Sequence, residues 1–119
     1  MKKIEPDLLE KAIQRLVSAL HSDKIYLYGS HAYGHPHENS DVDLLIIVNQ
    51  PELSIYDVTV EGYRALRGLF FPAEINVVTQ SEFEERSHWL SSIESTVSKK
   101  GRILYESKNE RSERMASKS

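Results

Sequence analysis

Apolar residues recur at spacings of three and four along the first part of the chain, and this period predicts an amphipathic helix over residues 7–20. Its apolar positions are Leu8, Leu9, Ala12, Ile13, Leu16, Val17 and Leu20. Pro6 stands just ahead of them, where its fixed φ suits the first turn of a helix. We therefore expect a helix that packs one face against the rest of the protein and carries no chemistry of its own.

Shorter apolar runs, rich in β-branched and aromatic residues, predict strands instead. Four such runs lie at residues 25–28, 44–48, 73–78 and 103–105. In the third run the side chains alternate, so Glu74 and Asn76 are predicted on one face and Ile75 and Val77 on the other. A strand with this pattern buries one face and leaves polar side chains on the other.

Polar residues with capping character mark where further helices begin. Ser54 is a candidate N-cap for a helix that extends to about Leu69 and turns Ile55, Val58 and Leu66 inward. A short helical turn is also expected over residues 30–34, directly after the first strand.

Two capping boxes, Ser81 with Glu84 and Ser91 with Glu94, predict two more helices, the second of which stops near Gly101. Helices and strands thus alternate along the chain. This order predicts an α/β or α+β fold in which a mixed β-sheet is flanked by helices.

The composition is that of one globular domain. The chain has 119 residues, of which 39% are hydrophobic and 28% charged. We assign residues 1–106 to this domain and expect residues 107–119, which are polar and charged, to form a disordered tail.

Charge and cysteine content exclude several classes of function. The formal net charge of −3 argues against broad nucleic-acid binding, which depends on Lys and Arg neutralising phosphates. The absence of cysteine rules out disulfides and thiolate metal sites and makes the cytoplasm the expected location. No apolar run approaches the ~20 residues of a membrane span, so no membrane anchor is expected.

Candidate chemistry is concentrated at the start of the second apolar run, where Asp41 and Asp43 lie two residues apart. In a strand, residues i and i+2 project from the same face, so the two carboxylates would lie close together. Their repulsion is costly unless a hard cation such as Mg²⁺ lies between them. The pair therefore predicts a divalent metal site.

Gly29 and Ser30 follow the first strand directly and are placed in a strand-to-helix turn. Glycine permits positive φ and a close approach of a ligand to the backbone. Serine is a good N-cap, and the free N–H groups at the start of a helix bind phosphate. The two residues are therefore interpreted as a phosphate cradle beside the metal site.

Other interpretations of this region are weaker or remain open. A calcium loop over Asn39, Asp41 and Asp43 is rejected, because Leu44 and Gln50 stand where such a loop needs Gly and Glu. The loop histidines His35 and His37 are better explained as solvated side chains than as metal ligands. A nucleotide contact from His31 or Tyr33 is more plausible, since both follow Ser30 closely.

On the later helices, Arg64 and Arg67 belong to a solvated face unless one of them reaches a triphosphate. Trp89 is better explained as a core or interface residue than as a cofactor stacker. Glu74 alone would be an exposed edge residue, but with two acidic residues upstream a converging triad is the better interpretation.

The residues Gly29-Ser30, Gly34 and the run from Ser40 to Leu44 resemble the GS…G…SD-x-DL signature of the nucleotidyltransferase superfamily that includes DNA polymerase β. The resemblance is greatest to its small prokaryotic members, the minimal nucleotidyltransferases of the antitoxin type. A third acidic residue is expected on a later strand, and Glu74 stands where the family usually has Asp. The segments 81–86 and 100–106 also resemble the family's downstream helix and final strand.

The resemblance implies catalytic and metal-binding roles for Asp41, Asp43 and Glu74, which would hold two Mg²⁺ ions, and nucleotide binding by Gly29, Ser30 and Ser40. The implied reaction transfers AMP from ATP to a hydroxyl.

Minimal nucleotidyltransferases often act with an all-helical HEPN protein and adenylylate its tyrosine, so a HEPN toxin is the implied partner. Two alternatives remain: a catalytically inactive subunit of the same fold that acts by binding a partner, and a transferase for antibiotics or metabolites, which usually has a further acceptor-binding domain. The sequence leaves open whether the chain forms an oligomer.

Overall fold

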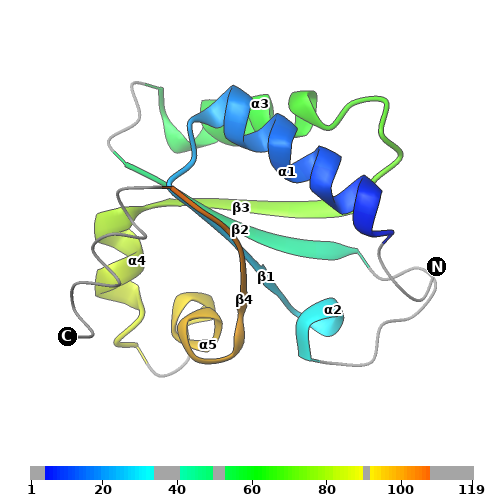
Figure 1. Cartoon of the computed structure of the whole chain (residues 1–119). Helices are drawn as coiled ribbons and strands as arrows, with labels where there is room; N and C mark the ends of the chain where they lie inside the picture. The colour runs from blue at the N-terminus through cyan, green and yellow to red at the C-terminus, as the bar shows by residue number, and fades with distance from the viewer. Residues whose placement is uncertain (1–4, 34–40, 50–52, 90–91, 108–119) are drawn as a thin grey trace.

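A computed structural model describes residues 5–33, 41–49, 53–89 and 92–107 of the chain. In chain order its elements are α1 (Pro6–Leu20), β1 (Lys24–Tyr28), α2 (Ser30–Tyr33), β2 (Val42–Val48), α3 (Ile55–Ala65), β3 (Ala73–Thr79), α4 (Gln80–Arg86), α5 (Ile93–Lys100) and β4 (Arg102–Glu106) (Figure 1). Within these ranges, none of the helices is both long and apolar enough to cross a membrane.

The four strands form one sheet in the order β3-β2-β1-β4. β2 and β3 run parallel and are connected through α3, whereas β1 pairs antiparallel with both β2 and β4. The parallel pair needs a crossover connection, because a tight turn joins only antiparallel strands. The predicted fold class, a mixed sheet flanked by helices, is confirmed.

One face of the sheet is covered by α1 and α3, which lie side by side across it (Figure 1, top). This closed face holds the main core, to which β2 contributes Val42, Leu44, Ile46 and Val48, each at most 2% exposed. From α1, Ala12 and Leu16 are fully buried, as the helical period predicts. The amphipathic helix predicted at residues 7–20 is therefore confirmed, with Pro6 in its first turn.

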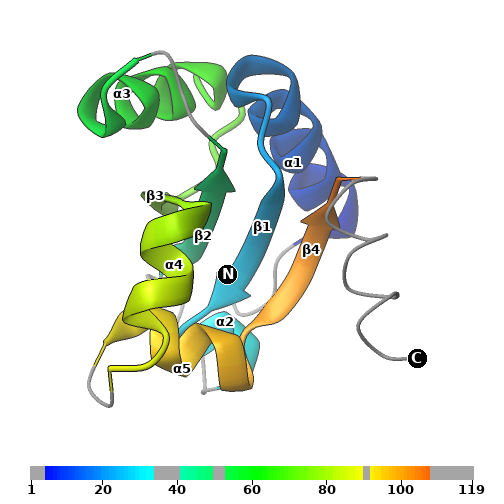
Figure 2. The same ribbon diagram turned by 90° about the vertical axis from the view of Figure 1, so that its left-hand side faces the viewer.

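The opposite face is covered by the shorter helices α4 and α5, with α2 at one end of the strands (Figures 1 and 2). Its core is smaller and consists of Tyr26, Leu45, Ile47, Val78, Phe83 and Val97. The rings of Tyr26 and Phe83 stack with centroids 5.6 Å apart. Because α4 and α5 are short, they leave the rest of this face open; we call it the open face.

Two helix boundaries differ from the predictions. α3 is capped by Ser54, as expected, but ends at Ala65 because the following residues turn back toward the sheet, with positive φ at Gly68 and Phe70. The first capping box is formed by Thr79 with Glu82. The predicted pair two residues later was wrong, because extended backbone at Thr79 already ends β3 and leaves its side chain free to cap the helix.

The later elements follow the prediction more closely. α5 ends before Gly101, as expected, but its cap is Ser92, whose hydroxyl accepts a hydrogen bond from the Ser95 N–H. Ser91, the predicted cap, lies outside the described residues. Trp89 is 53% exposed and is therefore not a core residue. Most of the predicted tail also lies outside the described ranges.

Candidate active site

Asp43 and Glu74 are direct neighbours across the parallel pair of β2 and β3. Both side chains lie on the open face, because Leu44 and Ile75, the next residue of each strand, belong to the core of the closed face. The two carboxyl groups lie close enough for each to affect the other directly, since Glu74 is among the causes that raise the pKa of Asp43. The structure thus brings together two of the three predicted acidic residues by strand register alone.

The electrostatics of Asp43 reflect this crowding. Burial raises the pKa of its carboxyl group, and the carboxylates of Glu74 and Asp41 raise that pKa further, while His31 acts in the opposite direction. Asp41 lies exposed just before β2. The charged form of Asp43 is thus disfavoured by two neighbouring carboxylates, and a bound cation would offset this repulsion.

Gly29 completes this corner of the sheet. It follows β1 with φ of +76°, a conformation that glycine adopts without strain. A Cβ at this position would overlap the carboxylate of Asp43, so the backbone of Gly29 lies directly against Asp43. α2 begins at Ser30 itself, so Ser30 is the first residue of the helix and not its predicted N-cap.

A polar contact not expected from the sequence lies beside the acidic pair. Tyr28 is the β1 neighbour of Asp43, and Asn76 follows Glu74 by two residues on the same face. The Asn76 Nδ2 donates a hydrogen bond to the Tyr28 hydroxyl over 2.5 Å. The bond crosses β2 on the open face, the face that also carries Asp43. It therefore fixes the side chains of Tyr28 and Asn76 near the carboxylates. Strand period alone predicts the correct face for Asn76 but not its partner.

Some of the predicted site residues fall in parts of the chain that the structure does not describe. Ser40, His35 and His37 lie outside the described residues, and so do the side chains of Ser30 and Tyr33.

The arginine of α3, Arg64, belongs to the other layer of the molecule. Arg64 is exposed and pairs with Glu61 over 2.9 Å, as a solvated helix face would. Tyr63 is used structurally, because its hydroxyl accepts a hydrogen bond from the N–H of Ile75 at the free edge of β3. The interpretation of Arg64 as a solvated side chain is therefore preferred.

A groove lies next to the acidic pair on the open face, between β3, the end of α4 and the start of α5; we call it the β3–α5 groove. Its volume is about 490 Å³. It is lined by Leu45, Asn76, Val77, Val78, Arg86, Trp89, Ser92, Ile93 and Glu94. Leu45 and Asn76 each follow a carboxylate residue by two positions, so the groove begins where the acidic pair ends. No sequence signal predicts it, because its walls come from four separate segments.

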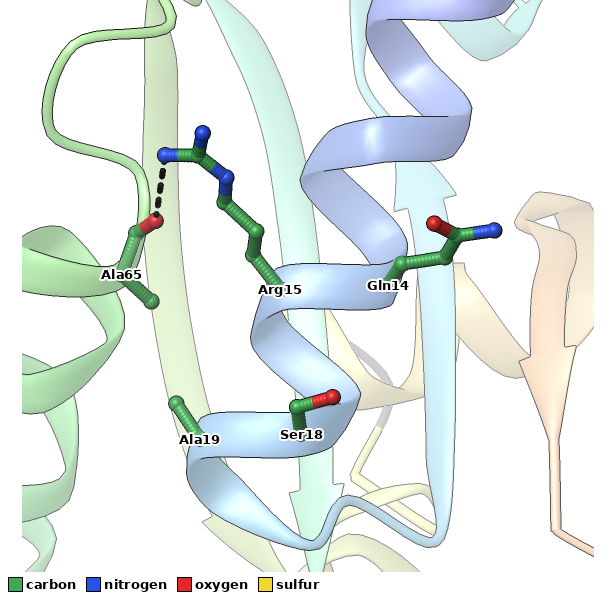
Figure 3. A pocket seen from close by; sticks show the side chains of 5 residues that line it. All are labelled: Gln14, Arg15, Ser18, Ala19 and Ala65. Atoms are coloured by element: carbon green, nitrogen blue, oxygen red, sulfur yellow. Dashed lines mark hydrogen bonds between the residues drawn. The ribbon is translucent and has the colours of Figure 1, made fainter.

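A second cavity, of about 500 Å³, lies between α1 and α3 (Figure 3). The Arg15 guanidinium crosses it and donates hydrogen bonds to the carbonyl groups of Ala65 and Arg67, over 3.4 and 3.1 Å. Ala65 is the last residue of α3, where the carbonyls of a helix lack intrahelical partners, and Arg67 lies two residues beyond it. Arg15 thus ties α1 to α3 on the closed face, away from the carboxylates.

The donor chemistry at the acidic pair fits a divalent cation. Asp43 and Glu74 supply adjacent carboxylate oxygens, the ligands that Mg²⁺ prefers, and Asp41 adds a third carboxylate close enough to act on Asp43. Within the described ranges, no three acidic, histidine or cysteine side chains already converge as a complete metal site. Two properties of the acidic pair therefore fit a divalent cation: its oxygen ligands are of the right type, and a cation would offset the repulsion between the carboxylates.

Comparison with known proteins decides the family. Residues 7–105 match the family model of the nucleotidyltransferase domain. The chain belongs to the nucleotidyltransferase domain family. This nucleotidyltransferase is also 35% identical, over 104 residues, to a protein of Methanocaldococcus jannaschii named as a candidate protein adenylyltransferase. The match covers 81% of this chain and 97% of that relative.

A solved structure agrees with the fold of the nucleotidyltransferase. A candidate nucleotidyltransferase from Sulfolobus solfataricus superposes with a TM-score of 0.59 at 19% identity, covering 84% of this chain and 78% of the other. Chains from two toxin–antitoxin structures, one of them with AMP-PNP, superpose with TM-scores of 0.47 and 0.49. Likeness at that level says nothing about a partner of this chain.

Proposed function

We propose that this nucleotidyltransferase transfers AMP from ATP to a hydroxyl group of a protein. The observation that carries the proposal is the register of β2 and β3, which sets Asp43 beside Glu74 next to the backbone of Gly29. Membership of the family supports the reaction type, and the relative named as a candidate protein adenylyltransferase supports the acceptor class.

We assign the acidic residues and the strand-to-helix turn complementary roles. Asp41, Asp43 and Glu74 would hold Mg²⁺, which neutralises the phosphate oxygens when bound. The backbone of Gly29, with Ser30 and Ser40, would receive the β- and γ-phosphates.

During transfer, the acceptor oxygen bonds to the α-phosphorus, the bond from the α-phosphorus to the bridging oxygen of the β-phosphate breaks, and pyrophosphate leaves. Glu74, at the exposed end of the pair, would take the proton of the hydroxyl group.

We also propose the identity of the partner protein and of the residue that is modified. A HEPN toxin, modified on a tyrosine, is the acceptor implied by the resemblance to antitoxin-type minimal nucleotidyltransferases. We further propose that residues 1–106 form the transferase unit, which the family match over 7–105 supports, with 107–119 as a polar appendage. The reaction would take place in the cytoplasm.

The direct test is to incubate the full chain with ATP labelled at the α-phosphate, Mg²⁺ and lysate of its host. A parallel reaction contains the double variant Asp41→Asn, Asp43→Asn. We expect labelled protein bands with the natural chain and none with the double variant, because the variant loses two metal-ligating carboxylates. Label that persists in the double variant would contradict the proposed site.

One specific observation favours a second function. Glu74 stands where the family usually has Asp, and the extra methylene moves its carboxylate outward, which is enough to disturb a geometry where ~1 Å costs ~10²-fold in rate. The chain would then be a non-catalytic subunit that acts by binding its partner. Restoration of labelling by Glu74→Asp, where the natural chain gives none, would support this alternative.

A further inference from the structure

The β3–α5 groove is a distinct feature of the open face that the assigned roles leave unused. It begins beside Glu74, on the edge strand β3, whereas Gly29 lies across the sheet at the end of β1. The acidic pair therefore separates the groove from the proposed phosphate site. The outer walls come from α4 and α5, and Figure 2 shows α4 in front of the strands and α5 below them.

We infer that the β3–α5 groove is the acceptor subsite and that it takes a tyrosine side chain of the partner protein. The inference rests on the proposed function. In an in-line displacement, the attacking oxygen and the leaving pyrophosphate lie on opposite sides of the reacting phosphorus. With the β- and γ-phosphates at Gly29, the acceptor must approach from the side of Glu74, which is the side of the groove.

The walls suit an aromatic ring that ends in a hydroxyl. Leu45 and Val78 form an apolar floor, while Trp89 and Ile93 stand at the rim with 53% and 50% of their surface exposed. An aromatic ring gains area and stacking energy against such walls. A serine or threonine side chain brings no ring to cover them, and its hydroxyl reaches less far from the partner's backbone.

The charges of the groove also favour a neutral occupant. Arg86 pairs with Glu82 over 2.9 Å and with the buried Glu94 over 3.4 Å, so its positive charge is balanced by two carboxylates. A phosphate or carboxylate group would have to compete with these pairs. A protonated phenol would not, and its hydroxyl could extend toward Glu74.

The single tryptophan of the chain makes the groove directly observable, because Trp89 gives one indole N–H signal in a ¹⁵N-correlated NMR spectrum. The full chain with Mg²⁺ is first saturated with a non-hydrolysable ATP analogue and then titrated with N-acetyl-L-tyrosinamide. We expect a saturable shift of the Trp89 indole signal upon adding the tyrosine probe. The matched probe N-acetyl-L-serinamide should leave the signal in place.

Two outcomes would overturn the inference: an indole signal that the tyrosine probe leaves unmoved, or competition between the ATP analogue and the tyrosine probe. Competition would mean that the groove holds the nucleoside. Failure of the proposed function is recognised separately, by a Gly29 amide that the ATP analogue does not shift and by absence of label transfer.

A matched pair of variants locates the binding. Ile93→Asp should weaken binding of the tyrosine probe about fivefold or more, because a charge replaces apolar surface at the rim. Ile103→Asp, at a similarly exposed isoleucine on the opposite edge strand β4, should leave binding unchanged. Equal weakening by both would contradict the location.

Discussion

The two faces of the sheet divide stability and chemistry between them. On the closed face, α1 and α3 cover a continuous apolar core. On the open face, the shorter α4 and α5 cover only part of the strands and leave an acidic pair and a groove. The division runs through single strands, since Leu44 is fully buried on one side of β2 and its neighbour Asp43 is part of the candidate site on the other.

This difference teaches that a small domain can separate the two tasks by strand period alone. Side chains alternate between faces, so adjacent residues can be selected for different purposes. The open face tolerates repulsion between carboxylates because the closed face supplies the hydrophobic stabilisation. Variants on the two faces should therefore differ in the size of their effect on stability, and removal of a repelling carboxylate on the open face should differ in sign as well.

The largest effect is expected for Leu44→Ala on the closed face. Removing a fully buried leucine loses hydrophobic burial and leaves a cavity, at a cost of about 3 kcal/mol in the free energy of unfolding. Urea denaturation measures it. Tyr56→Ala, at a tyrosine of α3 that is 76% exposed, should change stability by less than about 0.5 kcal/mol. Similar values for both variants would mean that the closed face is not the main core.

Gly29→Ala should have the next largest effect, and it should lower both the stability of the protein and its nucleotidyl transfer. The new Cβ meets the Asp43 carboxylate and the backbone keeps a positive φ, so we expect a loss of about 2 kcal/mol in the free energy of unfolding and a loss of nucleotidyl transfer. Urea denaturation and the label-transfer reaction measure the two losses.

The matched control for Gly29→Ala is Gly68→Ala. Gly68 has a φ of +89°, but no atom lies within 4 Å of the place that an added Cβ would occupy, so this variant measures the backbone cost alone, about 1 kcal/mol. If the two variants lost equal stability, the close contact between Gly29 and Asp43 would be refuted.

Arg86→Ala tests the polar part of the open face. It leaves Glu94, which is 7% exposed, without the guanidinium that pairs with it, and should cost about 1–2 kcal/mol. Arg64→Ala removes an exposed pair on α3 and should cost less than about 0.5 kcal/mol. Thermal and urea unfolding measure the loss of stability in both variants. A larger loss for Arg64→Ala than for Arg86→Ala would contradict the stabilising role given to the pair of Arg86 with Glu94.

Asp43→Asn should have the smallest effect on stability and the opposite sign. Removing one of two like charges that face each other across a strand pair should stabilise the metal-free protein by about 0.5 kcal/mol while abolishing transfer. Glu85→Gln, on the exposed side of α4, is the control and should change neither property. A clear loss of stability in Asp43→Asn would show that the pair is not repulsive.

Most of the fold was predictable because the apolar period of each segment is strong. The helix of α1, the strands and the faces of Glu74 and Asn76 follow from local spacing. The start of α4 did not, because Thr79 with Glu82 and Ser81 with Glu84 both fit the capping pattern. Only the end of β3, which depends on pairing with β2, decides between them.

The candidate site was predictable in its residues more than in its arrangement. The spacing of Asp41 and Asp43 indicated repulsion and a cation, and the family resemblance singled out Glu74 as the third carboxylate, but neither predicted the register that sets Glu74 directly beside Asp43. The bond between Asn76 and Tyr28 and the β3–α5 groove join segments far apart in the sequence. Such contacts are set by tertiary packing, for which a single sequence carries no local signal.

The parallel pairing of β2 with β3 also bears on how the molecule folds. Hairpin-like contacts close short loops and form early, whereas a parallel pair must wait until the crossover helix has folded back over the sheet. Asp43 and Glu74 meet only through that pairing. The same pairing brings Ile75 and Val77 of β3 into the core of the closed face, so we expect the acidic pair and the apolar core that bears its repulsion to form in one step.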